Sequence, residues 1–318
     1  MKLTGKRILI TGGSGLVGHH LRKELIARGL IDLVCPRSAD FDLRKPGDVE
    51  ALFRDVKPQV VFSLAARVGG ILDNKSYPAD FYFDNILIGA YTYDACARWH
   101  VEKLINVGAG CGYPLCLAEP LREEEFWDGF PQVESAPYSL AKKMLVIQGI
   151  AYRQQYGLRS VVLIPSNLYG EHDNFNLDQA HVIPALVRKF YEAAANSYPQ
   201  VEVWGDGSAK RDFIHTADFA NALVEAAENY DDPLPINIAY GAQYSIRDVV
   251  GLLKEIAGYA GRVFWDLNRP SGQNSREMSL DNARRHLPRF RPNINLKCGL
   301  NRTYRWFEKS YSSSDVRL

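Results

Sequence analysis

Tyr138 and Lys142 are the residues whose types and spacing most directly suggest chemistry. They stand four positions apart in the segment Tyr138-Ser-Leu-Ala-Lys142. On a helix, residues with this spacing share one face, so the ammonium lies beside the phenol and is expected to lower the phenol's pKa. A phenol held in this way can protonate an oxygen that gains negative charge when a carbonyl accepts a hydride. The pair therefore predicts an acid for a reduction.

A glycine-rich turn near the start of the chain supports this interpretation. Residues 7–11 are typical of a buried strand, and the turn after them opens an amphipathic helix. The turn consists of Gly12, Gly13, Ser14, Gly15, Leu16, Val17 and Gly18. The glycines at 12, 15 and 18 let backbone amides approach a pyrophosphate at the positive end of the helix. Together with the tyrosine and lysine, the turn indicates a nicotinamide cofactor.

The elements that position these residues alternate along the first half of the chain. Apolar runs predict strands near 7–11, 30–34, 60–64, 103–107 and 160–164, and helical patterns lie at 16–28, 46–56, 80–100 and 137–156. Such alternation predicts an α/β fold with a Rossmann-type doubly wound parallel sheet. Ligands of such sheets bind beyond the carboxyl ends of the strands. The glycine turn, residues 108–114 and residues 165–167 all follow predicted strands, so we expect them to converge in one cleft.

The pattern is less regular after Asn167. It predicts helices near 182–195, 216–229 and 245–257 and a short strand at 201–203. We expect residues 1–166 to bind the cofactor, with residues 213–240 packing back onto that domain. Residues 167–318 are expected to form mainly a smaller mixed α/β lobe that binds the substrate.

Composition and charge exclude several classes of protein. The 318 residues carry 38 Lys+Arg against 37 Asp+Glu, a formal charge of +1, so no overall field draws the chain to nucleic acid or to an anionic membrane. Five cysteines without a CxxC pair argue against a disulfide framework or a zinc site. We see neither a signal-peptide core nor a membrane-spanning apolar run. These features predict a soluble, cytoplasmic, metal-free enzyme.

The residues after the second predicted strand bear on the type of cofactor. An NAD-selective site usually places an acid there, whereas this chain has Cys35-Pro36-Arg37-Ser38. Arg37 suits a 2′-phosphate, which favours NADP(H), although it could also be an ordinary surface arginine. Asp42 and Leu43 are placed to meet the edge of the adenine.

Several further motifs carry a family resemblance that spans nearly the whole chain. They are Thr11–Gly18, Leu64-Ala-Ala66 with Val68-Gly-Gly70, Cys111-Gly-Tyr-Pro114, Tyr138–Lys142, Pro165–Gly170, and His172-Asp-Asn-Phe-Asn176 followed by His181-Val-Ile-Pro184. With these motifs the chain resembles the extended short-chain dehydrogenase/reductases and, within them, the GDP-L-fucose synthase family. Cys111 and the segment 172–184 carry the narrower resemblance.

The resemblance implies an NADPH-dependent 3,5-epimerase/4-reductase that acts on a GDP-4-keto-6-deoxy-hexose and forms a homodimer through helices 80–100 and 137–156. Cys111 and His181 would exchange protons at C3 and C5, Tyr138 would protonate O4, and Lys142 would hold the cofactor ribose. Cofactor contacts beyond the glycine turn would come from Leu64, Ala65, Ala66, Lys142, Pro165, Asn167, Leu168 and His181. Substrate contacts would come from Asn167, Val182, Arg188, Trp204, Arg211 and Arg276.

One position departs from the pattern of the superfamily. A serine or threonine is expected four residues before Tyr113, where it would donate a hydrogen bond to the substrate carbonyl, but this chain has Ala109. Loss of one such donor typically costs about 10²–10³ in rate. An engineered substitution in an otherwise competent enzyme, a natural enzyme that uses water or another donor, and partial loss of activity all fit. We favour the first and expect activity to be impaired.

Other functions remain open. A nucleotide-sugar 4,6-dehydratase would need a carboxylate pair where this chain has Gly110-Cys111, which counts against it. A relative that performs only C4 reduction or only C3/C5 epimerisation, on a hexose or a heptose, is the nearer alternative. A redox-silent NADP(H)-binding protein is a third possibility, which only Ala109 supports.

Overall fold

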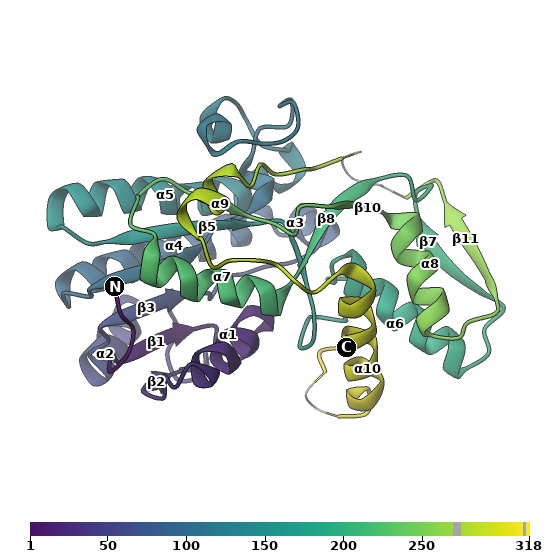
Figure 1. The fold of residues 1–318 in the computed structure, drawn as a ribbon, viewed down its shortest axis with the longest axis horizontal. Helices are drawn as coiled ribbons and strands as arrows, with labels where there is room; N and C mark the ends of the chain where they lie inside the picture. Colours follow the sequence, from purple (N-terminus) through teal and green to yellow (C-terminus); the bar gives the residue numbers. More distant parts are fainter. Residues whose placement is uncertain (270–274, 314–315) are drawn as a thin grey trace.

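Short apolar runs pair side by side in a parallel sheet, as the alternation of strands and helices predicts. Within the residues that the computed structural model describes (1–269, 275–313 and 316–318), this sheet has six strands. Their order is β2 (Leu33–Val34), β1 (Ile8–Thr11), β3 (Val60–Ser63), β4 (Lys103–Val107), β5 (Ser160–Pro165) and β9 (Ile236–Ile238). The predicted fold class is confirmed (Figure 1).

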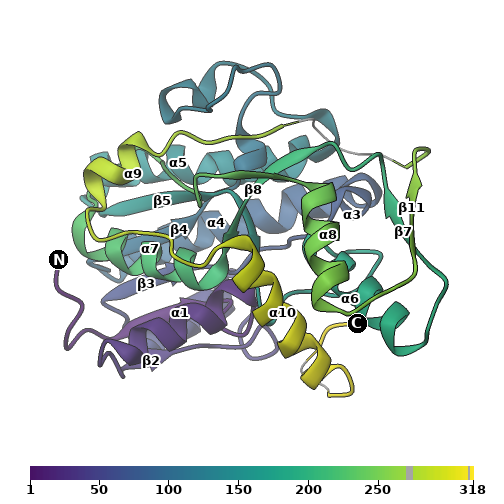
Figure 2. The same cartoon turned by 45° about the vertical axis from the view of Figure 1, so that its right-hand side comes forward.

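Helices cover both faces of the sheet because successive strand residues point to opposite sides. Ile8 and Ile10 of β1 join the core beneath α1 (Leu16–Ala27) and α7 (Thr216–Asn229). Leu9, between them, joins the core beneath α2 (Pro46–Val56), α4 (Pro78–Arg98) and α5 (Ala136–Tyr156). Figure 2 shows the two helical layers on either side of the sheet. The strands are therefore buried on both faces and read as continuous apolar runs.

The strand order reverses direction at β1, whose neighbours are β2 on one side and β3 on the other. A reversal of this kind leaves a crevice at the carboxyl ends of the two central strands, which is the usual ligand site of open α/β sheets. The glycine turn follows β1, and the loop that begins at Leu64 follows β3. Both candidate cofactor segments therefore lie at the same edge of the sheet.

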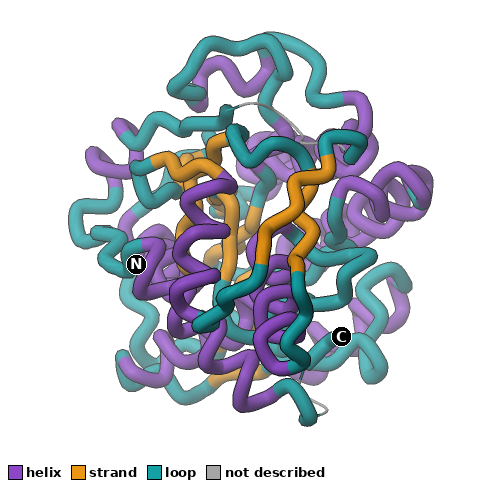
Figure 3. Tube along the Cα trace, turned by 90° about the vertical axis from the view of Figure 1, so that its right-hand side faces the viewer, coloured by secondary structure: helices purple, strands orange, loops and turns teal. Residues whose placement is uncertain are grey.

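The second lobe contains two small sheets and its own core. One sheet joins β6 (Asn167–Tyr169), β8 (Lys210–His215) and β10 (Gln243–Ser245), and the other joins β7 (Gln200–Trp204) and β11 (Arg262–Asp266). Helices α6 (Val182–Ala195), α8 (Ile246–Ile256) and α10 (Leu296–Ser310) contribute to this core. In Figure 3, which looks onto this lobe, its short strands lie among the helices.

Several elements escaped prediction. They are β6, β8 to β11, the short helices α3 (Ile71–Ser76) and α9 (Asp281–His286), and α10. Between β4 and α5, the chain forms 3₁₀ turns at Gly110–Gly112, Glu123–Trp127 and Val133–Ser135, and this connection projects beyond the sheet (Figures 1 and 2). Over the described residues, no helix combines the length and the apolar character needed to cross a bilayer.

Candidate active site

The glycine turn is packed too tightly to accept side chains. Gly12 has φ +68°, and a Cβ there would lie 2.8 Å from the backbone nitrogen of Ala65. A Cβ on Gly18 would lie 2.5 Å from the Cα of Gly13. Because the helix cap, Gly15, has no side chain, the first N–H groups of α1 remain open to an external acceptor. The turn is built to hold an anion such as a pyrophosphate.

The loop after β3 lies directly beside this turn. Leu64 donates its backbone N–H to Thr11 O at 3.2 Å, and Ala65 donates to Thr11 Oγ1 at 3.3 Å. Further along, Asn85 accepts the N–H of Arg67 and donates to its carbonyl. These bonds fix the predicted contacts Leu64, Ala65 and Ala66 next to the glycines.

The predicted adenosine contacts near the end of β2 differ in how available their side chains are to a ligand. Arg37 is 75% exposed, with Nε 3.6 Å from Asp40 Oδ2, so its guanidinium is available to a ligand at the surface. Hydrogen bonds from Arg44 lower the pKa of Asp42 to about 2. The side chain of Leu43 packs into the core, so only its backbone can face an adenine.

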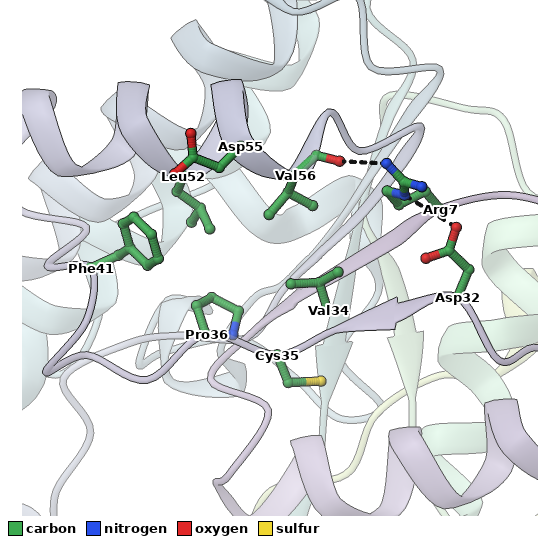
Figure 4. Close-up of a pocket in the computed structure, with 9 residues that line it drawn as sticks. All are labelled: Arg7, Asp32, Val34, Cys35, Pro36, Phe41, Leu52, Asp55 and Val56. Carbon is green, nitrogen blue, oxygen red and sulfur yellow. Dashed lines mark hydrogen bonds and ion pairs between the residues drawn. The ribbon is translucent and has the colours of Figure 1, made fainter.

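A cavity of about 430 Å³ lies between β2 and the end of α2, and neither Tyr138 nor Lys142 lines it. Apolar side chains of Val34, Phe41 and Leu52 line it. Figure 4 shows the sulfur of Cys35 turned away from Phe41 and Leu52. A Cβ on Gly13 would lie 3.0 Å from that sulfur, so Cys35 packs against the glycine turn.

The candidate catalytic groups gather where β4 ends. Cys111 lies in the 3₁₀ turn that follows this strand, and Tyr138 and Lys142 lie in the first two turns of α5. A charge on Cys111 acts on both groups, raising the pKa of Tyr138 and opposing the fall in the pKa of Lys142. The structure thus brings together three of the predicted catalytic residues.

The phenol does not behave as the spacing of tyrosine and lysine suggests. Burial, with a smaller contribution from Cys111, raises the pKa of Tyr138, which corrects the expectation that Lys142 lowers it. Burial also lowers the pKa of Lys142 to about 8. The ring of Tyr138 packs edge-on against Phe81 of α4, with centroids 6.1 Å apart. Desolvation of the phenolate therefore sets the direction of the Tyr138 shift.

Ala109 is buried at 8% exposure, in extended backbone immediately before the 3₁₀ turn. The next residue, Gly110, is closely packed, because a Cβ there would lie 2.6 Å from the flexible Met278 Cε and 3.2 Å from Pro165 O. The same Cβ would lie 3.9 Å from Nη1 of Arg276. Arg276 therefore lies close to the backbone on which the expected hydroxyl is absent.

His181 caps α6, and the segment before it docks on the first lobe. Gly70 donates its N–H to Gln179 O at 2.9 Å, and a Cβ on Gly70 would lie 3.1 Å from Ala180 O. Solvent reaches the imidazole, yet the surrounding protein lowers its pKa by desolvation. These properties suit a neutral proton acceptor.

The segment 172–176 packs against helices α1 and α10. His172 stacks on His19 of α1, with centroids 3.8 Å apart, and lies 4.6 Å from the ring of Trp306 in α10. Just before it, Glu171 Oε2 lies 3.0 Å from Nε2 of His215. Burial would raise the pKa of Glu171, but interactions with His20 and His215 outweigh it and lower the pKa. This segment joins α1 to the second lobe.

The predicted substrate contacts on the second lobe differ in the protein groups that surround them. Arg188 pairs with Glu192 at 2.8 Å and donates to Phe175 O, so its guanidinium already has protein partners. Trp204 lies beneath the Arg269 guanidinium, 5.3 Å from the ring centroid. Burial, together with the nearby charge of Arg276, lowers the pKa of Arg211 to about 10. Asn167 and Leu168 pair with β8, and Val182 begins α6.

Sequence reasoning missed Asp212, which holds the loops around Pro165. Its buried carboxylate accepts the hydroxyl of Ser166 at 2.9 Å and the N–H groups of Tyr240, Gly241 and Ala242. The carboxylate thereby ties β5 and β6 to the β9–β10 connection. The signal was an acid inside the apolar alternation of residues 211–215, next to a predicted substrate contact.

Known proteins share both this architecture and much of the sequence. Residues 8–239 match the NAD dependent epimerase/dehydratase family. GDP-L-fucose synthase of Escherichia coli K12 is 35% identical over 314 residues, covering 96% of this chain and 97% of that protein. The chain belongs to the GDP-L-fucose synthase family.

Solved structures extend the comparison. A GDP-L-fucose synthetase from Naegleria fowleri bound to NADP superposes with a TM-score of 0.93 at 28% identity, covering 100% of this chain and 98% of that one. A GDP-6-OMe-4-keto-L-xylo-heptose reductase from C. jejuni superposes with a TM-score of 0.91 at 29% identity, covering 98% and 99%. The likeness to members of the GDP-L-fucose synthase family therefore spans both lobes.

Proposed function

We propose that the chain is an NADPH-dependent 3,5-epimerase/4-reductase of a GDP-linked 4-keto-6-deoxy-hexose. The observation that carries this proposal is the gathering of Cys111, Tyr138 and Lys142 at the end of β4, at the same edge of the sheet as the glycine turn. The relatives named for GDP-L-fucose synthesis support it. Residues 1–166 bind the cofactor, and residues 167–318 mainly bind the sugar nucleotide.

The residues present fit an NADP(H) cofactor, which supplies the hydride when bound. The open N–H groups of α1 would receive the pyrophosphate, and Arg37 would meet the 2′-phosphate. The NADP-bound relative from Naegleria fowleri supports this choice over NAD. Lys142 would hold the nicotinamide ribose with its ammonium, whose pKa is lowered by burial to about 8.

Epimerisation requires one group to remove a proton and another to return one on the opposite face. Protons next to a ketone are acidic because the carbanion delocalises into the carbonyl oxygen. Cys111 and His181 are assigned to this exchange, because a thiol and an imidazole are side chains that can transfer protons near neutrality. The lowered pKa of His181 keeps the imidazole neutral and able to accept a proton.

Reduction then needs a proton for the oxygen of C4. Tyr138 holds its proton firmly in the buried site, and the alkoxide formed at C4 is a stronger base than a phenolate. The charged form of Lys142 stabilises the tyrosinate left behind. Ala109 offers this oxygen no hydroxyl donor, and the loss of that donor would by itself lower turnover.

The second lobe would bind the nucleotide part of the substrate, and helices α4 and α5 would form a dimer interface. Arg188 and Arg211 would meet the phosphates, and Trp204 would lie beside the guanine. Exposed apolar side chains on α4 and α5 support a homodimer through these helices: Tyr82 at 45%, Phe83 at 61%, Ile147 at 45% and Ile150 at 38% exposure. All five cysteines lie in the described part of the chain and are free thiols, which supports a reducing compartment such as the cytoplasm.

The likeness to the heptose reductase favours a second candidate, a C4 reductase without epimerase activity. One experiment separates the two. The protein is incubated with GDP-4-keto-6-deoxy-mannose in deuterated water, with and without NADPH. Deuterium at C3 and C5 together with NADPH consumption supports the bifunctional enzyme. NADPH consumption without label supports the reductase, label alone supports an epimerase, and neither signal overturns the proposal in favour of a redox-silent protein.

A further inference from the structure

Arg276 reaches the reaction centre from an otherwise unrelated part of the chain. Its Nη1 lies 3.9 Å from the position that a Cβ on Gly110 would occupy. Gly110 is the residue between Ala109, which lacks the expected hydroxyl, and Cys111. A charge on Cys111 also acts on the guanidinium of Arg276. These observations place a permanent cation beside residues 109–111.

The backbone around Arg276 is fixed on both sides. Ser275 Oγ donates to Glu119 Oε2 at 2.7 Å, and the N–H of Glu277 donates to Glu119 Oε1 at 3.0 Å. Leu121 continues the pairing, donating its N–H to Glu277 O at 2.9 Å and accepting the N–H of Ser279 at 2.9 Å. A guanidinium on such a support loses little entropy when it binds an oxygen, because its planar fork is already organised.

We propose that Arg276 donates a hydrogen bond to the C4 oxygen of the keto sugar and so replaces the hydroxyl donor that is absent at Ala109. This inference rests on the proposed function and deepens it. A guanidinium is a suitable substitute because it presents several N–H donors and remains charged throughout the reaction.

The same oxygen becomes negative in both halves of the reaction. When a base removes the C3 or C5 proton, the electron pair of the C–H bond moves into the ring and charge develops on O4. In the reduction, hydride adds to C4, the C=O π bond breaks toward oxygen, and O4 takes the proton of Tyr138 Oη. Arg276 gives up no proton in either step. Its donor stabilises both oxyanions, so its loss must slow both processes.

Two other positions of the guanidinium would give different results. If Arg276 contacted the diphosphate, its replacement would weaken the binding of GDP itself, as we expect for the replacement of Arg211. If it contacted only the Cys111 thiolate, its replacement would slow exchange at C3 and C5 and leave the reduction unchanged. Both can therefore be distinguished from the proposed role by measuring GDP affinity, exchange and reduction separately.

The test compares Arg276→Met in two backgrounds, the parent chain and Ala109→Ser. Deuterium exchange into GDP-4-keto-6-deoxy-mannose, single-turnover NADPH oxidation and the Kd of GDP are measured for each. Arg122→Met serves as a control, since Arg122 is an exposed arginine whose ion pair with Asp281 lies 3.6 Å apart. Thermal unfolding verifies that each variant is folded.

We expect R276M to slow exchange and reduction by a similar factor of about 10² in the parent and by less than about tenfold in A109S. A109S alone should accelerate the parent by less than about tenfold. R122M should match the parent. Equal losses in both backgrounds, a main effect on the Kd of GDP, or loss of exchange alone would each overturn the inference. A parent chain inactive in both assays would overturn the proposed function, and with it this role for Arg276.

Discussion

Asp173 offers a sharp test of how burial sets the energetics of the segment before His181. Its side chain is 6% exposed, and Oδ1 accepts the N–H of Asn174 at 2.7 Å. Oδ2 is buried with no hydrogen-bond partner among the described residues. Burial raises the pKa of this carboxyl to about 7, although the Asn174 bond and the charge of Arg317 lower it. We predict that Asp173→Asn removes a pH-dependent penalty on folding.

The sign follows from which state binds more protons. The carboxyl titrates near 3.8 in the unfolded chain and near 7 in the folded chain, so between these values the folded chain is the more protonated. Stability must then fall as pH rises across this window. At about 1.4 kcal/mol for each pKa unit, the shift costs up to about 4 kcal/mol above pH 7. A buried amide has unmet hydrogen bonds of its own, so we expect a net gain of about 1–3 kcal/mol at pH 8.

Urea unfolding at pH 5 and pH 8 measures the effect. The parent should lose stability between these values, and D173N should lose about 1–3 kcal/mol less. Asp178→Asn is the matched control, because Asp178 lies exposed on the same loop. Parallel pH profiles for the parent and D173N would refute the reasoning, because they would show that the buried carboxyl is ionised across the whole range.

Three further predictions concern the site itself. Gly18→Ala should abolish NADPH binding, measured by fluorescence titration, because its Cβ would lie 2.5 Å from Gly13 Cα; binding within threefold of the parent would contradict the tight turn. Because burial lowers the pKa of Lys142 to about 8, reduction should slow as pH rises above 8 and the ammonium is lost, whereas Lys142→Arg, permanently charged, should show no such decline despite a lower rate. Cys111→Ser and His181→Asn should each slow deuterium exchange by about 10²-fold or more while retaining GDP affinity; unchanged exchange would remove that residue from the proton relay.

The elements that the sequence predicts well are those whose own residues determine their form. Strands β1, β3, β4 and β5 are apolar on both faces, and α6 begins and ends where its pattern predicts, at Val182 and Ala195. The missed strands depend on partners far away in sequence. Residues 210–215 mix lysine, arginine and aspartate with apolar residues and become a strand only between β10 and β6. Such tertiary pairing overrides local preference.

The same division applies to the site. The meeting of Cys111 with Tyr138 and Lys142 is predictable, since each motif follows a strand end or opens the helix beside it. The direction of the Tyr138 pKa shift is not, because it depends on the balance between desolvation and charge inside the folded protein. Arg276 was expected among the substrate contacts, but only the pairing of its neighbours Ser275 and Glu277 with residues 119–121 brings it to Gly110.

The histidines around Glu171 give the segment 171–176 a structural role. His215 Nδ1 accepts the N–H of Ala217 at 3.2 Å, so the proton of the neutral imidazole is on Nε2, which faces Glu171 Oε2. His20 faces the same oxygen from α1, at 3.4 Å. The helix whose first turn would hold the cofactor pyrophosphate is thereby fixed to the chain that leads to His181. Because proton and hydride transfer tolerate little displacement, we infer that this buried contact helps to set the distance between a bound cofactor and the imidazole of His181.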